Sequence, residues 1–352
     1  TQVLKEGEVQ GSDVAAHSTG ILDIKTTILP NADALFLTAI DKYGHELWRW
    51  TFPVDKLNQT NEVFSPLSGK ATYSETENEL TVKAKNHTFI FSKRDGQLKG
   101  VSVNNHKISF ANGPRFIGAR RADRSLDQFY NHDDEKAKEK DRTYSEFPDA
   151  AVFTKLEVKE DGGNLIVTAN YKLGNLDKAQ WTINPNGEAA LDYTYNFSGV
   201  VDLIGISFDY PEDQVISKRW LGAGPYRVWQ NRIHGTQYDV WENDYNDPIP
   251  GETFTYPEFK GYFDSVSWMN IRTKEGTISL TNETPDSYIG VYQPRDGRDR
   301  LLYTLPESGI SVLDVIPPVR NKVNSTDLCG PSSQPKWVNG PQTVRIIFRF
   351  ME

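Results

Sequence analysis

Tryptophans are the residues of this chain best suited to binding chemistry, because an indole face can stack on the C–H face of a sugar ring while polar neighbours bind its hydroxyls. Trp229, Trp241 and Trp337 stand beside turn-forming residues, whereas Trp181 and Trp268 stand in strand-like stretches. Burial is the commoner fate of any one tryptophan. We expect Trp181 and Trp268 to be core residues, and the other three to be candidates for an exposed sugar contact, with Trp337 favoured by the Pro, Asn and Gly residues around it.

Carboxylates do not yield a catalytic assignment. Glycoside hydrolysis needs two carboxyl groups about 5 to 9 Å apart, and the 48 Asp and Glu residues can be paired in many ways. The alternating strand and helix units of a barrel, whose strand ends usually carry such groups, are absent from the pattern. We therefore predict no catalytic residue in this chain.

Metal ligands are not indicated either. The six histidines show no zinc-type spacing. Residues 242–247 hold the oxygen ligands that calcium prefers, but they lack the regular spacing of a calcium loop, and turns favour the same residues. We predict a polar loop and no cofactor, with a bound calcium, magnesium or sodium ion left open.

The composition of the chain limits the classes of partner that we expect it to bind. The formal net charge is −9 and the basic residues are scattered, which argues against a nucleic-acid partner. No apolar run approaches the roughly 20 residues that cross a bilayer, so we expect no membrane partner. Cys329 is the only cysteine, which excludes an intrachain disulfide and suits a cytoplasmic setting as well as a periplasmic or secreted one. Thr1 carries neither an initiator Met nor a signal segment, so we expect the chain to be part of a longer product.

Hydrophobic side chains recur with a period of two almost everywhere, which predicts short antiparallel strands separated by Gly, Asn and Pro turns. Many strands at this spacing indicate an all-β sandwich. The expected strands cover residues 80–84, 89–91, 101–103, 108–110, 156–158, 165–173, 179–183, 191–197, 203–210 and 344–350.

Two further regions differ from this pattern. Residues 131–142 carry charges of both signs at helical spacing and predict a solvated helix. The first 54 residues hold three or four candidate strands, at 21–28, 34–40 and 45–53, which are few for an independent sandwich. We place a boundary within 54–64 and divide the chain into residues 1–60 and 61–352.

One stretch resembles a known signature. Residues 220–232 read Trp-Leu-Gly-Ala-Gly-Pro-Tyr-Arg-Val-Trp-Gln-Asn-Arg, which is similar to the Trp-x-Gly-x-Gly-Pro-x-Glu-x-Tyr-x-Asp-Arg motif in the C-terminal small-chain domain of family 2 β-galactosidases. Residues 257–268 resemble the segment that follows it in that family. Residues 110–123, with Gly-Pro-Arg-Phe, look like the family's Arg-Ala-Pro-x-Asp-Asn-Asp loop, and residues 21–52 resemble the last strands of its immunoglobulin-like domain.

The resemblance implies a large antiparallel β-supersandwich of the galactose mutarotase type from about residue 65 onward, preceded by an incomplete immunoglobulin-like segment. It implies a non-catalytic, carbohydrate-binding or structural region, whose partner is a catalytic barrel of the same polypeptide or complex. In the family a Trp near the C-terminus reaches the sugar, and Trp337 matches it. Arg227 and Trp229 replace the Glu and Tyr of the signature, which puts galactose specificity in question. The predicted sugar-binding residues are Trp337, Trp229, Arg227 and Arg115.

Two other functions stay open on sequence grounds. One is a stand-alone carbohydrate-binding module that meets a separate catalytic subunit. The other is an aldose epimerase of the mutarotase type, which needs a His acid and a carboxylate base. His132 and His234 are its candidate histidines.

Overall fold

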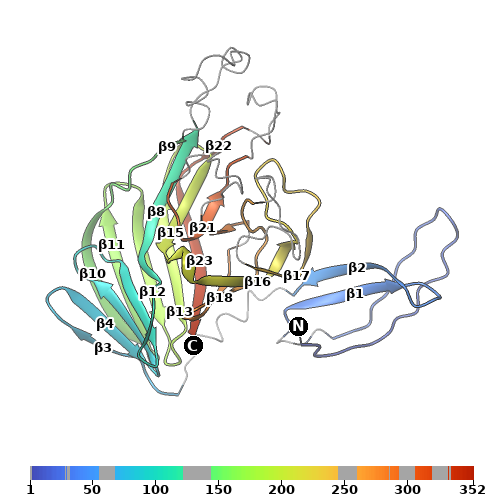
Figure 1. Cartoon of the computed structure of the whole chain (residues 1–352), viewed down its shortest axis with the longest axis horizontal. Helices are drawn as coiled ribbons and strands as arrows, with labels where there is room; N and C mark the ends of the chain where they lie inside the picture. The colour runs from blue at the N-terminus through green and yellow to red at the C-terminus, as the bar shows by residue number, and fades with distance from the viewer. Residues whose placement is uncertain are drawn as a thin grey trace, which may run out of the picture. The chain divides into compact units, whose positions relative to one another are not determined.

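The computed structural model describes residues 2–27, 29, 32–54, 68–121, 144–244, 260–284, 286–292, 306–318, 332 and 334–352. The chain divides into two compact units, Thr1–Val63 and Phe64–Glu352 (Figure 1). Each unit is described by itself below.

The first unit contains one antiparallel pair, β1 (Ala34–Ile40) and β2 (Glu46–Pro53). Their register gives one face of the pair six apolar residues: Leu35, Leu37, Ala39, Trp48, Trp50 and Phe52. The strand predicted over 21–28 is wrong for residues 21–27, which form no strand. Ile21 is 89% exposed, so it lacks the neighbouring apolar surface that a strand needs to form.

The second unit is built from two large antiparallel sheets. The nine-stranded sheet has the order β10-β11-β12-β13-β23-β19-β18-β16-β17. Its strands are β10 (Val152–Asp161), β11 (Asn164–Lys172), β12 (Leu176–Ile183), β13 (Ala189–Asn196), β16 (Val215–Gly224), β17 (Gln237–Asp244), β18 (Trp268–Thr273), β19 (Gly276–Asn282) and β23 (Pro341–Met351).

The ten-stranded sheet has the order β20-β21-β15-β8-β6-β5-β4-β3, with β7 added beside β6 and β9 beside β8. Its strands are β3 (Thr72–Glu75), β4 (Glu79–Ala84), β5 (His87–Ser92), β6 (Leu98–Val103), β7 (His106–Ile108), β8 (Ala111–Arg121), β9 (Tyr144–Glu146), β15 (Leu203–Asp209), β20 (Tyr288–Val291) and β21 (Ile310–Val315). A small pair, β14 (Gly199–Val201) with β22 (Lys336–Val338), and a single 3₁₀ turn, η1 (Glu212–Gln214), complete the described elements.

The alternating pattern forms these strands because every second side chain enters the core. Leu80, Val82 and Ala84 of β4 are each no more than 1% exposed. The turn between β6 and β7 uses Asn104 and Asn105, both with positive φ (49° and 67°), which is the conformation of a tight hairpin that Asn tolerates well.

Aromatic side chains from both sheets meet in one core. Phe91 of β5 packs edge-on against Trp181 of β12, with ring centroids 6.1 Å apart. Phe208 of β15 contacts Trp181 at 6.0 Å and Phe348 of β23 at 5.5 Å. The two sheets therefore form a sandwich, which confirms the predicted all-β antiparallel fold. Trp181 is a core residue, as predicted, at 1% exposure, whereas Trp268 is only partly buried.

Three local predictions meet different outcomes. The charged helix predicted over 131–142 lies outside the described residues. The predicted polar loop at 242–247 is wrong in its first half, because residues 242–244 end β17 and pair with β16. The segment 110–123, which resembles a loop, is instead strand from Ala111 to Arg121, since β15 and β6 offer it hydrogen-bonding partners on both sides.

Candidate functional site

Trp337 is the most exposed tryptophan of the described residues. It is the middle residue of β22 and pairs with Val200 of β14, and 68% of its surface is open to solvent. Tryptophan is usually far more buried than this. Its strand is short, and the loop that follows is tied down by Ser198, whose hydroxyl donates to Asn339 Oδ1 at 3.0 Å and accepts from the Gly340 N–H at 3.2 Å. The indole is thus displayed on an anchored segment.

The signature-like stretch 220–232 is hydrogen-bonded to the residues that precede this segment. Gln230 connects the two: its side-chain Nε2 donates to the Gln334 carbonyl at 2.7 Å, and its backbone N–H donates to the Pro317 carbonyl at 3.1 Å. Gln230 is 7% exposed. A buried amide that holds the residues just before β22 is a positioning element for Trp337.

The signature-like stretch is also held by a close approach between its backbone and that of residues 261–262. Val228 and Tyr262 exchange two backbone hydrogen bonds, each of 2.7 Å. Gly261 makes this possible, because a Cβ at that position would lie 1.8 Å from the Val228 carbonyl oxygen. A glycine is therefore required at position 261 for this packing.

Two of the predicted sugar-binding residues, Trp229 and Arg227, are buried by this packing. Trp229 is 1% exposed and packs edge-on against Tyr262, with ring centroids 5.8 Å apart. Arg227 is 3% exposed, and its guanidinium lies 5.9 Å from the centre of the Phe263 ring. Side chains this buried cannot stack on a sugar that arrives from solvent, so both belong to the support of the site. Trp241, another candidate, is partly buried, and its indole N–H donates to the Gln237 carbonyl at 3.1 Å.

Charged groups gather close to β22. Burial raises the pKa of Asp264, and the negative charge of Asp286 adds to this, while Lys336 of β22 opposes it. Burial, together with the same two carboxylates, raises the pKa of Tyr288 to about 12. A carboxylate with these neighbours can accept hydrogen bonds from hydroxyls. Sequence reasoning missed Asp264, although it lies inside the segment 257–268 that was singled out.

Arg115 lies elsewhere, in a separate cavity that we call the Arg115 pocket. The cavity holds about 490 Å³ and is formed by the start of β8, the end of β15 and the segments around 210–212, 292 and 307–309. Arg115 Nη2 is 3.1 Å from Asp209 Oδ1, and Asn112 Nδ2 donates to Asp209 Oδ2 at 2.8 Å. Both oxygens of Asp209 are therefore held in place.

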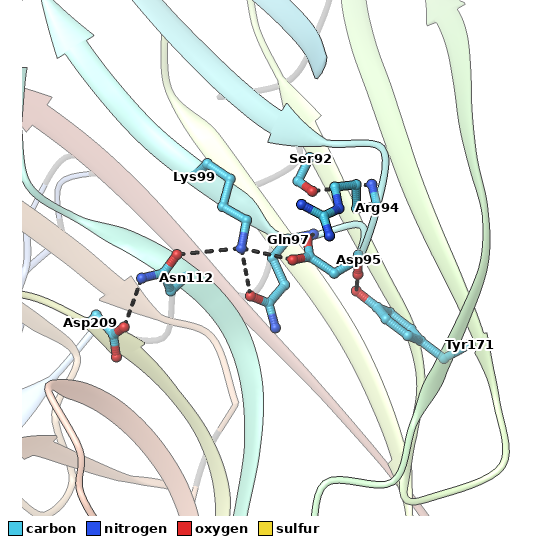
Figure 2. Close-up of polar contacts among 8 residues, drawn as sticks. All are labelled: Ser92, Arg94, Asp95, Gln97, Lys99, Asn112, Tyr171 and Asp209. Carbon is cyan, nitrogen blue, oxygen red and sulfur yellow. Dashed lines mark hydrogen bonds and ion pairs between the residues drawn. The ribbon is translucent and has the colours of Figure 1, made fainter. Parts of the chain in front are cut away.

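A chain of polar groups extends behind Asn112 (Figure 2). Lys99 Nζ lies between Asn112 Oδ1 at 3.4 Å, Gln97 Oε1 at 3.2 Å and Asp95 Oδ2 at 2.8 Å. Burial favours a raised pKa for Asp95, but hydrogen bonds from Lys99, the Gln97 N–H and Ser92 together hold that pKa below its usual value. Asp95 thus stays ionised and fixes Lys99, which in turn fixes Asn112.

Glu275 holds two residues of the pocket lining, Ser109 and Tyr210, in place. Its carboxylate accepts from the Ser109 N–H at 2.9 Å, from the Ser109 hydroxyl at 2.7 Å and from the Tyr210 hydroxyl at 3.0 Å. Burial raises the pKa of a second carboxyl group, that of Asp149, and the Arg115 charge partly opposes this. The guanidinium therefore lies under the influence of two carboxylates.

Trp337 and Arg115 do not share a site. Val200, the partner of Trp337, precedes β15, whereas Asp209 is the last residue of that strand. At about 3.3 Å per residue, β15 alone separates them by about 20 Å. The strands that carry these two predicted sugar-binding residues therefore place Trp337 and Arg115 toward opposite ends of β15.

The epimerase hypothesis finds little support in the residues that can be placed. His132 lies outside the described residues. His234 is exposed, and its backbone carbonyl accepts from the Tyr226 hydroxyl at 3.2 Å. It is not among the residues that line the Arg115 pocket.

Metal-binding and membrane-spanning features are not seen in the described parts of the chain. Within the ranges given above, His, Cys, Asp and Glu side chains do not assemble in threes in a way that could hold a metal ion. The same ranges contain no helix with the length and apolar character required to span a membrane.

Comparison with known proteins places these features in context. A family model described as the β-galactosidase small chain matches residues 83–309. No curated protein matches the chain.

Solved structures with some similarity include galactose 1-epimerase from Lactobacillus acidophilus NCFM (TM-score 0.44, 9% identity, 81% of this chain and 99% of that one). Others are a GalM/aldose epimerase homologue from C. elegans (0.38, 8%, 80% and 99%) and a galactose mutarotase-like protein from Lactobacillus casei ATCC 334 (0.32, 10%, 80% and 99%).

Proposed function

Because the chain belongs to the β-galactosidase small chain family, we propose that it is the C-terminal, non-catalytic region of a family 2 β-galactosidase-like glycoside hydrolase. In this proposal it supports a catalytic barrel carried by the same polypeptide or complex. It also contributes a sugar contact through Trp337.

The exposed indole of Trp337 is the observation that carries the sugar contact. A side chain of this size left 68% open forfeits much of the free energy that burial would give, roughly 25 cal/mol per Å² of apolar surface. An indole displayed on an anchored strand suits the apolar face of a sugar ring. Lys336 and Asp264 add charged hydrogen-bonding groups near the same strand.

The packing beneath β22 supports the structural half of the proposal. Most of the signature-like stretch is buried, and Gln230 within it is hydrogen-bonded to Gln334, just before Trp337. In this proposal the signature-like stretch acts by positioning Trp337, while the chemistry of hydrolysis is left to carboxylates of the barrel partner. In this proposal Arg227 and Trp229, which depart from the family signature and are buried, belong to the support and not to the sugar contact.

Titrating tryptophan fluorescence with methyl β-galactoside tests the contact. The Trp337→Ala variant should bind about 30-fold more weakly, the change that follows from about 2 kcal/mol at a dominant aromatic contact. Trp50→Ala is the matched control, since Trp50 is also exposed, at 44%, but lies in the first unit. Equal titrations for Trp337→Ala and the wild type would remove Trp337 from the function.

The same preparation tests the absence of catalysis. The purified chain should neither hydrolyse nitrophenyl β-galactoside nor interconvert galactose anomers faster than buffer. Hydrolysis that persists through repeated purification would overturn the non-catalytic assignment, and faster anomer interconversion would favour the epimerase instead.

A further inference from the structure

We propose that the Arg115 pocket is a second carbohydrate-binding subsite, which takes a neutral sugar through a pair of neighbouring hydroxyls. The choice of a sugar as the ligand rests on the proposed function, whereas the location of the subsite rests on the geometry of the pocket itself.

The size of the cavity fits a small ligand. Its volume of about 490 Å³ falls within the roughly 300 to 1,000 Å³ of ordinary ligand pockets. Tyr210 and Tyr292 both contribute to the lining. Their hydroxyls are engaged, by Glu275 at 3.0 Å and by the Pro211 carbonyl at 3.1 Å, which fixes the two rings as part of the wall.

The Arg115–Asp209 pair provides complementary hydrogen-bonding groups. A guanidinium carries five N–H donors in a planar fork, and a carboxylate carries about four acceptor positions. Among the described residues, Arg115 uses Nη2 for Asp209, and Asp209 accepts one bond on each oxygen. The side chains are 34% and 49% exposed. Two neighbouring hydroxyls, each both donor and acceptor, match such a pair because one can accept from the fork while the other donates to the carboxylate.

The charges lining the cavity disfavour an anionic ligand. Arg115 is the one basic residue of the lining, against the three carboxylates of Asp209, Glu212 and Glu307. A metal ion is disfavoured for a different reason. Both oxygens of Asp209 already face N–H donors, from Asn112 and Arg115, and these donors repel a cation placed against the same carboxylate. The charges of the lining therefore favour a neutral ligand.

The pocket is already organised before a ligand arrives. Asn112 holds a left-handed backbone conformation, with φ of 53°, and is fixed from behind by Lys99 and Asp95 (Figure 2). Gly113 next to it presses against Phe208, since an added Cβ would lie 2.3 Å from that ring. Little side-chain freedom is left to be lost on binding, which favours affinity for a weakly held sugar.

Ligand-observed saturation-transfer NMR with lactose separates this subsite from Trp337. In a Trp337→Ala background, lactose signals should persist, and adding Asp209→Asn should reduce them at least tenfold. Asp177→Asn, which removes one charge from an exposed position on β12, is the matched control and should leave them intact. Melting curves verify that each variant is folded.

Arg115→Lys provides a second route if Asp209→Asn does not fold, because it keeps the charge but loses the planar fork, and it should weaken lactose binding likewise. Galacturonate should give a weaker signal than galactose in the Trp337→Ala background.

The outcomes separate the two proposals. Signals abolished by Trp337→Ala alone overturn the second subsite and leave the Trp337 contact standing. Signals lost with Asp209→Asn but unaffected by Trp337→Ala support the subsite and overturn the Trp337 contact. The absence of any sugar signal from the wild type overturns both, and a calcium titration that perturbs the resonances of residues around Arg115 would replace the sugar with a cation.

Discussion

Gln230 is the residue through which the buried signature controls the exposed indole. Its side-chain amide reaches the Gln334 carbonyl at 2.7 Å, two residues before β22 begins. The Gln230→Ala variant removes this donor and with it the hydrogen bond to that carbonyl. We expect the segment 334–340 to open more often, while the sandwich core stays folded.

The size of the effect follows from the loss of this one hydrogen bond. A hydrogen bond contributes about 0.5 to 1.5 kcal/mol net to stability. Taking about 1 kcal/mol as the middle of that range, the opening equilibrium of the segment rises about 5-fold. This is small against the stability of a domain with so large a core, so global unfolding should shift much less.

Hydrogen exchange followed by mass spectrometry measures the opening directly. Peptides that cover 334–340 should exchange about 5-fold faster in Gln230→Ala, while peptides from β12 and β13 keep their protection. Gln237→Ala is the control, because Gln237 is exposed and contributes only its backbone carbonyl to Trp241. Unchanged exchange of the segment in Gln230→Ala would show that Gln334 is held by other contacts. It would refute the claim that Gln230 positions the segment that carries Trp337.

Two further predictions concern stability. Gly261→Ala places a Cβ 1.8 Å from a backbone carbonyl oxygen and should lower the free energy of unfolding by about 3 kcal/mol or more through overpacking and lost backbone hydrogen bonds. Gly100→Ala, where an added Cβ meets nothing within 4 Å, should change it by less than about 0.5 kcal/mol, and urea titration compares them; equal losses would refute the clash. Burial raises the pKa of Asp314, against a smaller opposing effect from a tyrosine hydroxyl that donates to it. The folded state therefore holds this proton more tightly than the unfolded state, and stability falls as pH rises from the usual carboxyl pKa toward the raised one. Asp314→Asn should remove that part of the pH dependence and gain stability relative to the wild type at neutral pH; parallel pH profiles of the two proteins would contradict this.

Local pattern was enough to predict most of the sandwich. The alternation of Leu80, Val82 and Ala84 places one face of a strand in the core whatever the partner strand is, and Asn104-Asn105 marks a hairpin by its tolerance of positive φ. Such signals are contained within a few residues. They fixed the fold class but not the pairing order of the sheets.

The site depended on contacts between distant residues. Trp229 looked exposed because turn residues surround it, yet a backbone approach by Gly261, about thirty positions later, covers it. Arg115 and Asp209 meet because β8 and β15 pair, and no spacing within either strand reveals this. Trp337 is the candidate that is exposed in the structure, because the Pro and Gly residues around it keep its strand short.

The position of β23 has a consequence for how the molecule is made. This strand, Pro341–Met351, lies between β13 and β19 in the nine-stranded sheet. The two halves of that sheet are therefore not joined by strand pairing until β23 is in place. Phe348, which contacts both Trp181 and Phe208, arrives with it. During synthesis, residue 351 must therefore have left the ribosome before β23 can pair and the core can close. Until then the edges of β13 and β19 are open to other partners, which makes them the points where chaperones or misassembly would compete with folding.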